Sequence, residues 1–166
     1  MAAALVWRRL AANPARAVAV GLGAGAFEAL LLGLTGSVGS LVVMATGQTD
    51  LALNSLAGVA QTPLLWLTGP FERVIAILAH TAARVLVLRA VAGRRWLGFC
   101  AGFGWLSGMD LLAGVGWLTG MVTSASLWLV ELMILPFGVL SLPLILSAVR
   151  RWPVAEPSPV AVADDS

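Results

Sequence analysis

Four carboxylates and the only histidine of this chain lie within stretches that are otherwise apolar enough to cross a membrane. These residues are Glu28, Glu72, His80, Asp110 and Glu131. A charged group near the bilayer centre costs at least about 2.5 kcal/mol on insertion scales, so such residues usually face a bundle interior or a wet cavity. A carboxylate there can take a proton from water, and an imidazole can stabilise an oxyanion. The pattern therefore predicts a polar site inside the membrane.

The predicted depths of these residues are compatible with one site. At 1.5 Å per residue, Glu28 lies about 18 Å and Asp110 about 20 Å above the inner ends of their spans. His80 lies about 15 Å below the outer end of its own span, and Glu72 and Glu131 lie nearer that surface. One polar layer, from mid-membrane to the outer leaflet, can hold all five residues.

Two arginines accompany the histidine. Arg73, His80 and Arg84 are separated by 7 and 4 residues and so share one helical face. Glu72 is displaced from that face by roughly 80°. A guanidinium one turn from an imidazole suits the binding of an anion or oxyanion. Arg73 and Arg84 are therefore predicted binding residues.

Composition identifies the elements that must hold these groups. The chain has 166 residues, of which 60% are hydrophobic and 11% charged, whereas about a quarter of the residues of a soluble domain are charged. This length accommodates one domain, and the apolar stretches are continuous rather than alternating, which disfavours a β-barrel. We therefore predict an all-α, polytopic membrane helical bundle with about four transmembrane helices.

The first apolar stretch, Ala17–Gly47, is longer than one crossing needs. Either it forms a tilted helix, or the helix ends near Thr35–Ser40 and the remainder bends along the surface. The other predicted spans are Pro70–Leu88, Trp96–Leu118 and a fourth ending near Val149. Residues 1–150 form the predicted transmembrane domain, and the proline-rich, acidic tail 151–166 is expected to be a disordered cytoplasmic segment.

Arginine asymmetry predicts the topology. The loop arginines fall before the first span, between the second and third, and after the fourth, so both termini are predicted to be cytoplasmic. This arrangement describes a multi-pass protein of the cell membrane. The excess of basic over acidic residues is explained by the topology and by the phospholipid of the bilayer. A nucleic-acid-binding surface is not indicated, because no aromatic residues for stacking interleave with the arginines.

The segment Gly21–Ala26 imitates a dinucleotide-binding fingerprint, but it lies within a membrane span and lacks an acid at the expected spacing. Gly21 and Gly25 form a GxxxG pair, which permits close helix packing. The third span carries further glycines at Gly98, Gly102, Gly104 and Gly108. Such faces favour helix packing and are also candidate oligomer contacts.

The segments Gly21–Ala29, Phe71–His80 and Val85–Val87, followed by Asp110, resemble the YhfC family of intramembrane metalloproteases or glutamic-type proteases. That family is related to the CAAX-protease and bacteriocin-processing group. The resemblance covers roughly residues 15–115. It implies an enzyme that hydrolyses a peptide bond of a membrane or prenyl/leader-peptide substrate. The residues it implies as catalytic are Glu28, Glu72, His80 and Asp110.

The chain departs from the family pattern at Ala24 and Leu106, where the family's motifs usually place histidines. A catalytic zinc ion usually takes three protein ligands. If zinc is the cofactor, its ligands are His80, Glu28 and Asp110. A glutamic mechanism needs less, with Glu28 or Glu72 as the base and His80 as the oxyanion donor. We expect the family's Glu-Glu-x-x-x-Arg motif, where encoded, to lie upstream of Met1.

Two other interpretations stay open. One is a catalytically inactive homologue that binds a membrane client. The other is a small transport or assembly subunit that uses Glu28 and Asp110 as proton or cation sites. A carboxylate within reach of His80, beside space for a peptide bond, favours the peptidase.

The arginine asymmetry generates a test of topology. A single cysteine introduced between Gln48 and Leu67, with Cys100 replaced by alanine, should react with an impermeant maleimide added outside the cell, because this segment is predicted to be extracytoplasmic. Labelling only after the cytoplasm is opened would reverse the predicted orientation.

Overall fold

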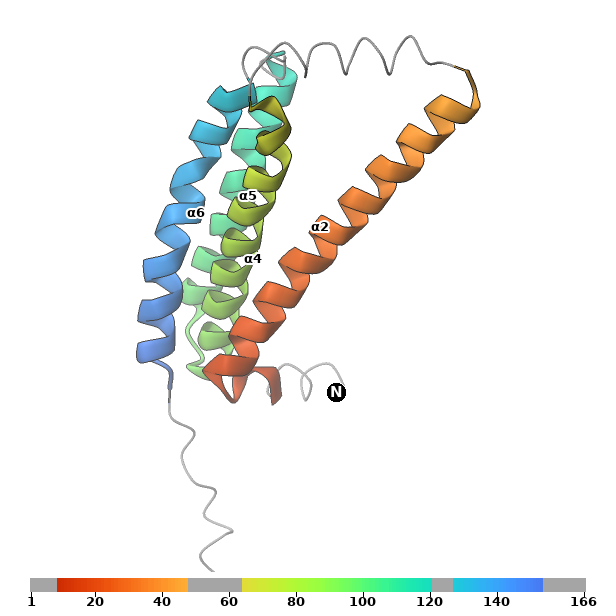
Figure 1. Ribbon diagram of the computed structural model, residues 1–166. Helices are drawn as coiled ribbons and strands as arrows, with labels where there is room; N and C mark the ends of the chain where they lie inside the picture. The colour runs from red at the N-terminus through yellow and green to blue at the C-terminus, as the bar shows by residue number, and fades with distance from the viewer. Residues whose placement is uncertain (1–8, 48–63, 121–126, 154–166) are drawn as a thin grey trace, which may run out of the picture.

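A computed structural model describes residues 9–47, 64–120 and 127–153, which are helical apart from short turns (Figure 1). The long helices are α2 (Pro14–Ala45), α4 (Thr68–Ala92), α5 (Trp96–Leu118) and α6 (Leu127–Arg150). A short 3-10 helix, η1 (Leu65–Leu67), leads into α4. The prediction of a disordered tail falls, from residue 154 onward, outside the described residues.

The four long helices are each long and apolar enough to span a membrane, with 23 to 32 residues apiece. About 20 apolar residues suffice to cross the hydrocarbon core. The predicted all-helical bundle with four membrane spans is therefore confirmed. The start of α2 and the end of α6 lie at the same end of the bundle (Figure 1).

Helix α2 is continuous across the glycine cluster at which the sequence allowed it to end. It starts at Pro14 behind Asn13, whose Oδ1 accepts a hydrogen bond from the Ala15 amide at 2.8 Å. Thr35 and Ser37 donate their hydroxyl hydrogens to carbonyls four residues earlier, so these polar groups are satisfied without interrupting the helix. The helix is inclined to the other three (Figure 1), as the tilted alternative predicts.

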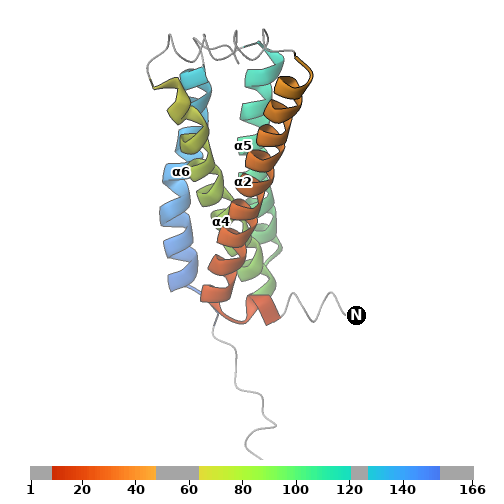
Figure 2. The same ribbon diagram turned by 45° about the vertical axis from the view of Figure 1, so that its right-hand side comes forward.

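Helix α4 is the central element, because α2, α5 and α6 all pack against it. Figure 2 shows α2 and α4 crossing each other, with α6 on one side and α5 on the other. Its buried face includes several alanines, at Ala76, Ala79, Ala82 and Ala83. Small residues let neighbouring backbones approach closely, which drives helix association in lipid.

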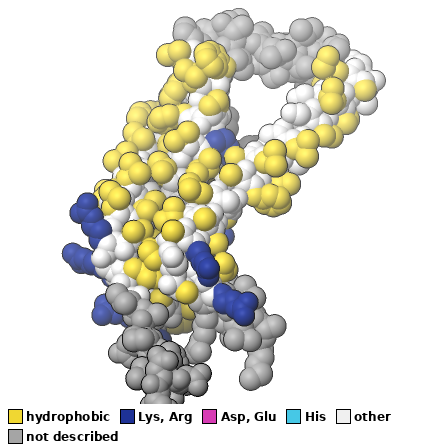
Figure 3. Space-filling model, turned by 60° about the horizontal axis from the view of Figure 1, so that its bottom comes forward, with side chains coloured by type: hydrophobic (Ala, Val, Ile, Leu, Met, Phe, Trp, Pro, Cys, Tyr) yellow, Lys and Arg dark blue, Asp and Glu magenta, His cyan; other side chains and the backbone are white. Residues whose placement is uncertain are grey.

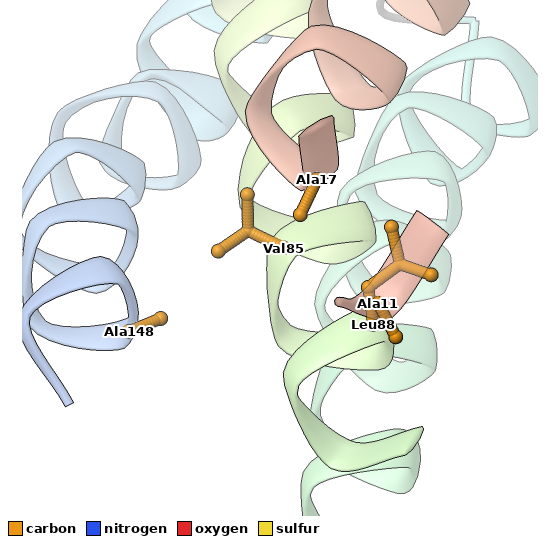
Figure 4. Packing of buried hydrophobic residues seen from close by; sticks show 5 residues of the cluster. All are labelled: Ala11, Ala17, Val85, Leu88 and Ala148. Carbon is orange, nitrogen blue, oxygen red and sulfur yellow. The ribbon is translucent and has the colours of Figure 1, made fainter. Parts of the chain in front are cut away.

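The end of the bundle at which α2 begins and α6 ends is held by a cluster of buried aliphatic side chains (Figure 4). Val85 and Leu88 of α4 meet Ala17 of α2, Ala148 of α6 and Ala11 of the segment before α2. The arginines at the start of α2, in the turn between α4 and α5 and at the end of α6 surround this end. Figure 3 shows dark blue basic side chains there and yellow hydrophobic ones along the helices.

The closest contact between α2 and α4 is made by two glycines. A Cβ atom added at Gly21 would lie 2.5 Å from the Cα of Thr81, and one at Gly25 would lie 2.8 Å from the Cα of Ile77. The two contact points are thus four residues apart on each helix. Helices that pack through GxxxG pairs cross at about −40°, so they separate beyond the contact.

The C-terminal half of α2 accordingly leaves the bundle. Residues 30–42 are all exposed within the described chain, on every face of the helix. A Cβ atom added at Gly33 would meet nothing within 4 Å. The structure therefore has one half in which α2 packs against the other helices, near the start of α2, and another half in which α2 stands apart (Figure 1).

This contrast predicts unequal effects of one substitution. Gly25→Ala should destabilise the protein by about 1–3 kcal/mol, the usual cost of overpacking, because its methyl group overlaps the α4 backbone. The matched change Gly33→Ala adds the same methyl group in open space and should leave stability within about 0.5 kcal/mol. Unfolding of both variants in mixed micelles provides the comparison. Equal losses would contradict the proposed close contact.

Candidate functional site

The side chains of Glu28 and His80 meet between α2 and α4. Oε2 of Glu28 lies 2.5 Å from Nε2 of His80, which is an ion-pair distance. The two side chains are 44% and 11% exposed, respectively. The prediction that Glu28 and His80 face one another is therefore confirmed. The contact at Gly25 and Ile77 lies immediately beside the pair and brings the two backbones close enough for both side chains to touch.

The pair lies deep within the spans. Glu28 is about 21 Å along α2 from Pro14, and His80 is about 18 Å along α4 from Thr68. The hydrocarbon core is about 30 Å thick, so both residues fall near its middle. A carboxylate and an imidazole at this depth need each other or water, because an isolated charge there is costly.

Asp110 of α5 is the third member of this polar group. Its carboxylate is close enough to interact electrostatically with both Glu28 and His80. Within the described residues it forms no ion pair, and it is exposed on the surface of α5. Asp110 therefore lies in the neighbourhood of the pair without a hydrogen bond or ion pair to it among the described residues.

The second ring nitrogen of His80 has a different environment. Nδ1 is buried and has no hydrogen-bond partner among the described residues. A buried polar atom without a partner costs about 1–3 kcal/mol. Nδ1 is therefore the ring atom that remains open to a further partner, whereas Nε2 is engaged by Glu28.

The other predicted site residues form a separate group near the starts of α4 and α6, which is called the outer group below. Glu72 makes an ion pair with its neighbour Arg73. Glu131 of α6 is close enough to interact electrostatically with both. Glu72 lies about 12 Å along α4 from His80. The single polar layer expected from depth thus consists of two groups, and Glu72 is not beside the histidine.

Glu131 was not among the residues selected from the sequence as catalytic. It is 3% exposed, and its Oε2 atom has no hydrogen-bond partner in the described chain. The feature of the sequence that could have indicated a role for Glu131 is the presence of a carboxylate inside the apolar segment Leu127–Arg150. Its burial depends on the packing of α6 against α4, which spacing within α6 does not reveal.

The two predicted binding arginines differ. The guanidinium of Arg73 is occupied by the carboxylate of Glu72. Arg84 is partly buried one turn below His80, and it forms no hydrogen bond or ion pair with any other described residue. Of the two, Arg84 retains its hydrogen-bonding capacity near the Glu28 and His80 pair.

Comparison with protein families identifies the chain. Residues 5–134 match the model of the YhfC intramembrane metalloprotease family. The chain belongs to this family. Its four apolar helices agree with a multi-pass membrane protein. The matched region includes Glu28, Glu72, His80 and Asp110. No curated protein and no solved structure matches the chain.

The family description implies a metal ion, and the donor set can be tested against it. A catalytic zinc ion usually takes three protein ligands. In the part of the chain that the structure describes, no three His, Cys, Asp or Glu side chains come close enough to hold a metal ion. The set His80, Glu28 and Asp110 proposed from the sequence is therefore not assembled. These donors do not fit an ordinary zinc site.

This donor set predicts the metal content. The purified full chain should carry well below one zinc ion per molecule by plasma mass spectrometry, because two adjacent donors bind zinc weakly. His80→Ala should not change the amount. Stoichiometric zinc in the unmodified protein that is lost in His80→Ala would contradict the prediction and would mean that further donors join the pair.

Proposed function

We propose that this YhfC-family protein is a membrane-embedded peptidase in which Glu28 and His80 act together on a peptide bond. The observation that carries the proposal is the 2.5 Å contact between Glu28 and His80 near the middle of the apolar helices α2 and α4. A carboxylate paired with an imidazole is the minimum set for activating water and stabilising an oxyanion. Of the two glutamates considered as the base, only Glu28 touches the histidine.

In the proposed reaction, Glu28 accepts a proton from water while the water oxygen forms a bond to the carbonyl carbon of the substrate. Protonation removes the negative charge of Glu28 and weakens its hold on His80. The imidazole N–H can then donate to the developing oxyanion. The C–N bond breaks as Glu28 returns the proton to the leaving nitrogen. One water molecule is consumed, and a carboxylic acid and an amine are formed.

The arrangement of α2 supports a substrate that lies in the membrane. Glu28 is 44% exposed and lies where α2 separates from α4, just before the exposed residues 30–42. An approaching polypeptide segment therefore meets Glu28 from the side of the opening. A peptide bond must be released from helical hydrogen bonding before water can attack it, and such backbone is tolerated in the membrane only where protein or water satisfies it.

A second candidate function is binding of a membrane client without cleavage. It is favoured by one observation, the lack of a three-ligand metal group among the described residues. Both candidates use the exposed side of Glu28, where α2 separates from α4. They differ in whether the pair performs chemistry.

Substitutions distinguish the candidates. With a panel of fluorogenic transmembrane peptides in proteoliposomes, Glu28→Gln should lower cleavage by at least about a hundredfold, because the amide cannot accept the proton. His80→Ala should lower it by about 100 to 1000 fold, the usual effect of losing an oxyanion donor.

Glu72→Gln provides the matched control, since it removes the same charge from a glutamate of the separate outer group. It should retain activity within about threefold, because the carboxylate does not touch His80. Activity that survives both Glu28→Gln and His80→Ala would exclude the proposed mechanism. Retained binding of a peptide with no cleavage by the unmodified protein would favour the client-binding function.

A further inference from the structure

A cavity with a volume of about 990 Å³ lies at the inner end of the bundle. It is formed by the end of α4, the start of α5 and the residues that follow α6. Three arginines line it, at Arg89, Arg95 and Arg151. No acidic residue is among its described lining residues. The cavity is separate from the Glu28 and His80 pair, and the proposed reaction does not use it.

The local backbone holds these arginines around the cavity. Helix α4 ends in a Schellman motif, in which the amide of Arg95 donates to the carbonyl of Ala90 at 2.9 Å and that of Arg94 donates to Val91. Arg94 occupies the left-handed position of the motif with φ 51°. Nε of Arg89 donates to the carbonyl of Arg151 at 3.3 Å, which ties the end of α4 to the end of α6.

The remaining wall of the cavity is apolar. Leu86, Trp96 and Leu97 contribute to it together with Pro153. Trp96 is 72% exposed and Leu97 is 83% exposed, so the apolar wall is continuous with the surface that faces lipid. Tryptophan is enriched at the level of the headgroups. The cavity is thus lined partly by arginine side chains and partly by apolar side chains.

We propose that this cavity binds the phosphate headgroup of an anionic phospholipid, with an acyl chain lying against Trp96 and Leu97. Guanidinium groups bind phosphate oxygens through paired, charge-assisted hydrogen bonds. Basic pockets between transmembrane helices on the cytoplasmic side are suited to anionic headgroups. The apolar wall distinguishes a lipid from free phosphate, because inorganic phosphate has nothing to place against it.

Native mass spectrometry of the full chain, released from micelles, tests the proposal. Dioleoyl phosphatidylglycerol and dioleoyl phosphatidylcholine are added in equal amounts, and the bound fractions are compared. The unmodified protein should retain the anionic lipid with at least about tenfold preference, as expected for charge-assisted hydrogen bonds to phosphate. Arg95→Gln and Arg151→Gln should each reduce this preference severalfold.

Arg94→Gln is the matched control. It removes the same charge from the same turn, but Arg94 does not line the cavity, and the preference should be unchanged. Equal losses in Arg94→Gln and Arg95→Gln would overturn the proposal, because they would reveal attraction by overall charge. An unchanged preference in Arg95→Gln and Arg151→Gln would also overturn it.

Thermal unfolding separates the two sources of phosphate. Phosphatidylglycerol should raise the midpoint of unfolding of the unmodified protein, whereas inorganic phosphate at the same concentration should not. Equal stabilisation by both would overturn the assignment to a lipid. Arg95→Lys, which keeps the charge, should recover part of the stabilisation that Arg95→Gln loses, and this excludes simple misfolding of the latter variant.

Discussion

The structure depends on the close contact of α2 with α4 at Gly21 and Gly25. No side chain separates the two backbones there, so polar side chains of ordinary length can meet across the interface. Glu28 and His80 do so at 2.5 Å. The same contact fixes the crossing of the helices, and the crossing leaves the C-terminal half of α2 exposed in the described chain. The pairing of Glu28 with His80 and the separation of residues 30–42 from the other helices therefore both follow from the glycine contact.

Much of the bundle could be predicted from the sequence, because apolar length alone identifies a span. Helix α5 coincides with its predicted segment, Trp96–Leu118, since arginines precede it. The sequence left open whether α2 continues past Thr35. The hydroxyl group of Thr35 donates to a helical carbonyl, which allows the helix to continue, and this hydrogen bond is not evident from the sequence pattern. The facing of Glu28 and His80 followed from depth, and the structure confirms it.

The membership of Glu72 in the site was harder to predict. The broad polar layer inferred from depth included it, but Glu72 lies about 12 Å along α4 from His80, and the adjacent Arg73 engages its carboxylate. The burial of Glu131 likewise depends on α4 as a partner for α6. The predicted zinc ligands His80, Glu28 and Asp110 are not assembled in the described chain. Asp110 lies near the other two residues but does not form with them a group that could hold a metal ion. Membership in a metalloprotease family therefore does not specify the chemistry of these residues.

The length of α2 has a mechanical consequence. If the helix pivots at Gly25, its end at Ala45 lies about 30 Å from the pivot, whereas Glu28 lies only about 4.5 Å from it. A rotation of about 10° would then move the outer end by about 5 Å and Glu28 by less than about 1 Å. Glu28 and Ala45 lie on the same side of this pivot, and Glu28 is much the closer of the two. Such a rotation would therefore change the separation of the C-terminal part of α2 from the other helices while the distance between carboxylate and imidazole stays nearly constant.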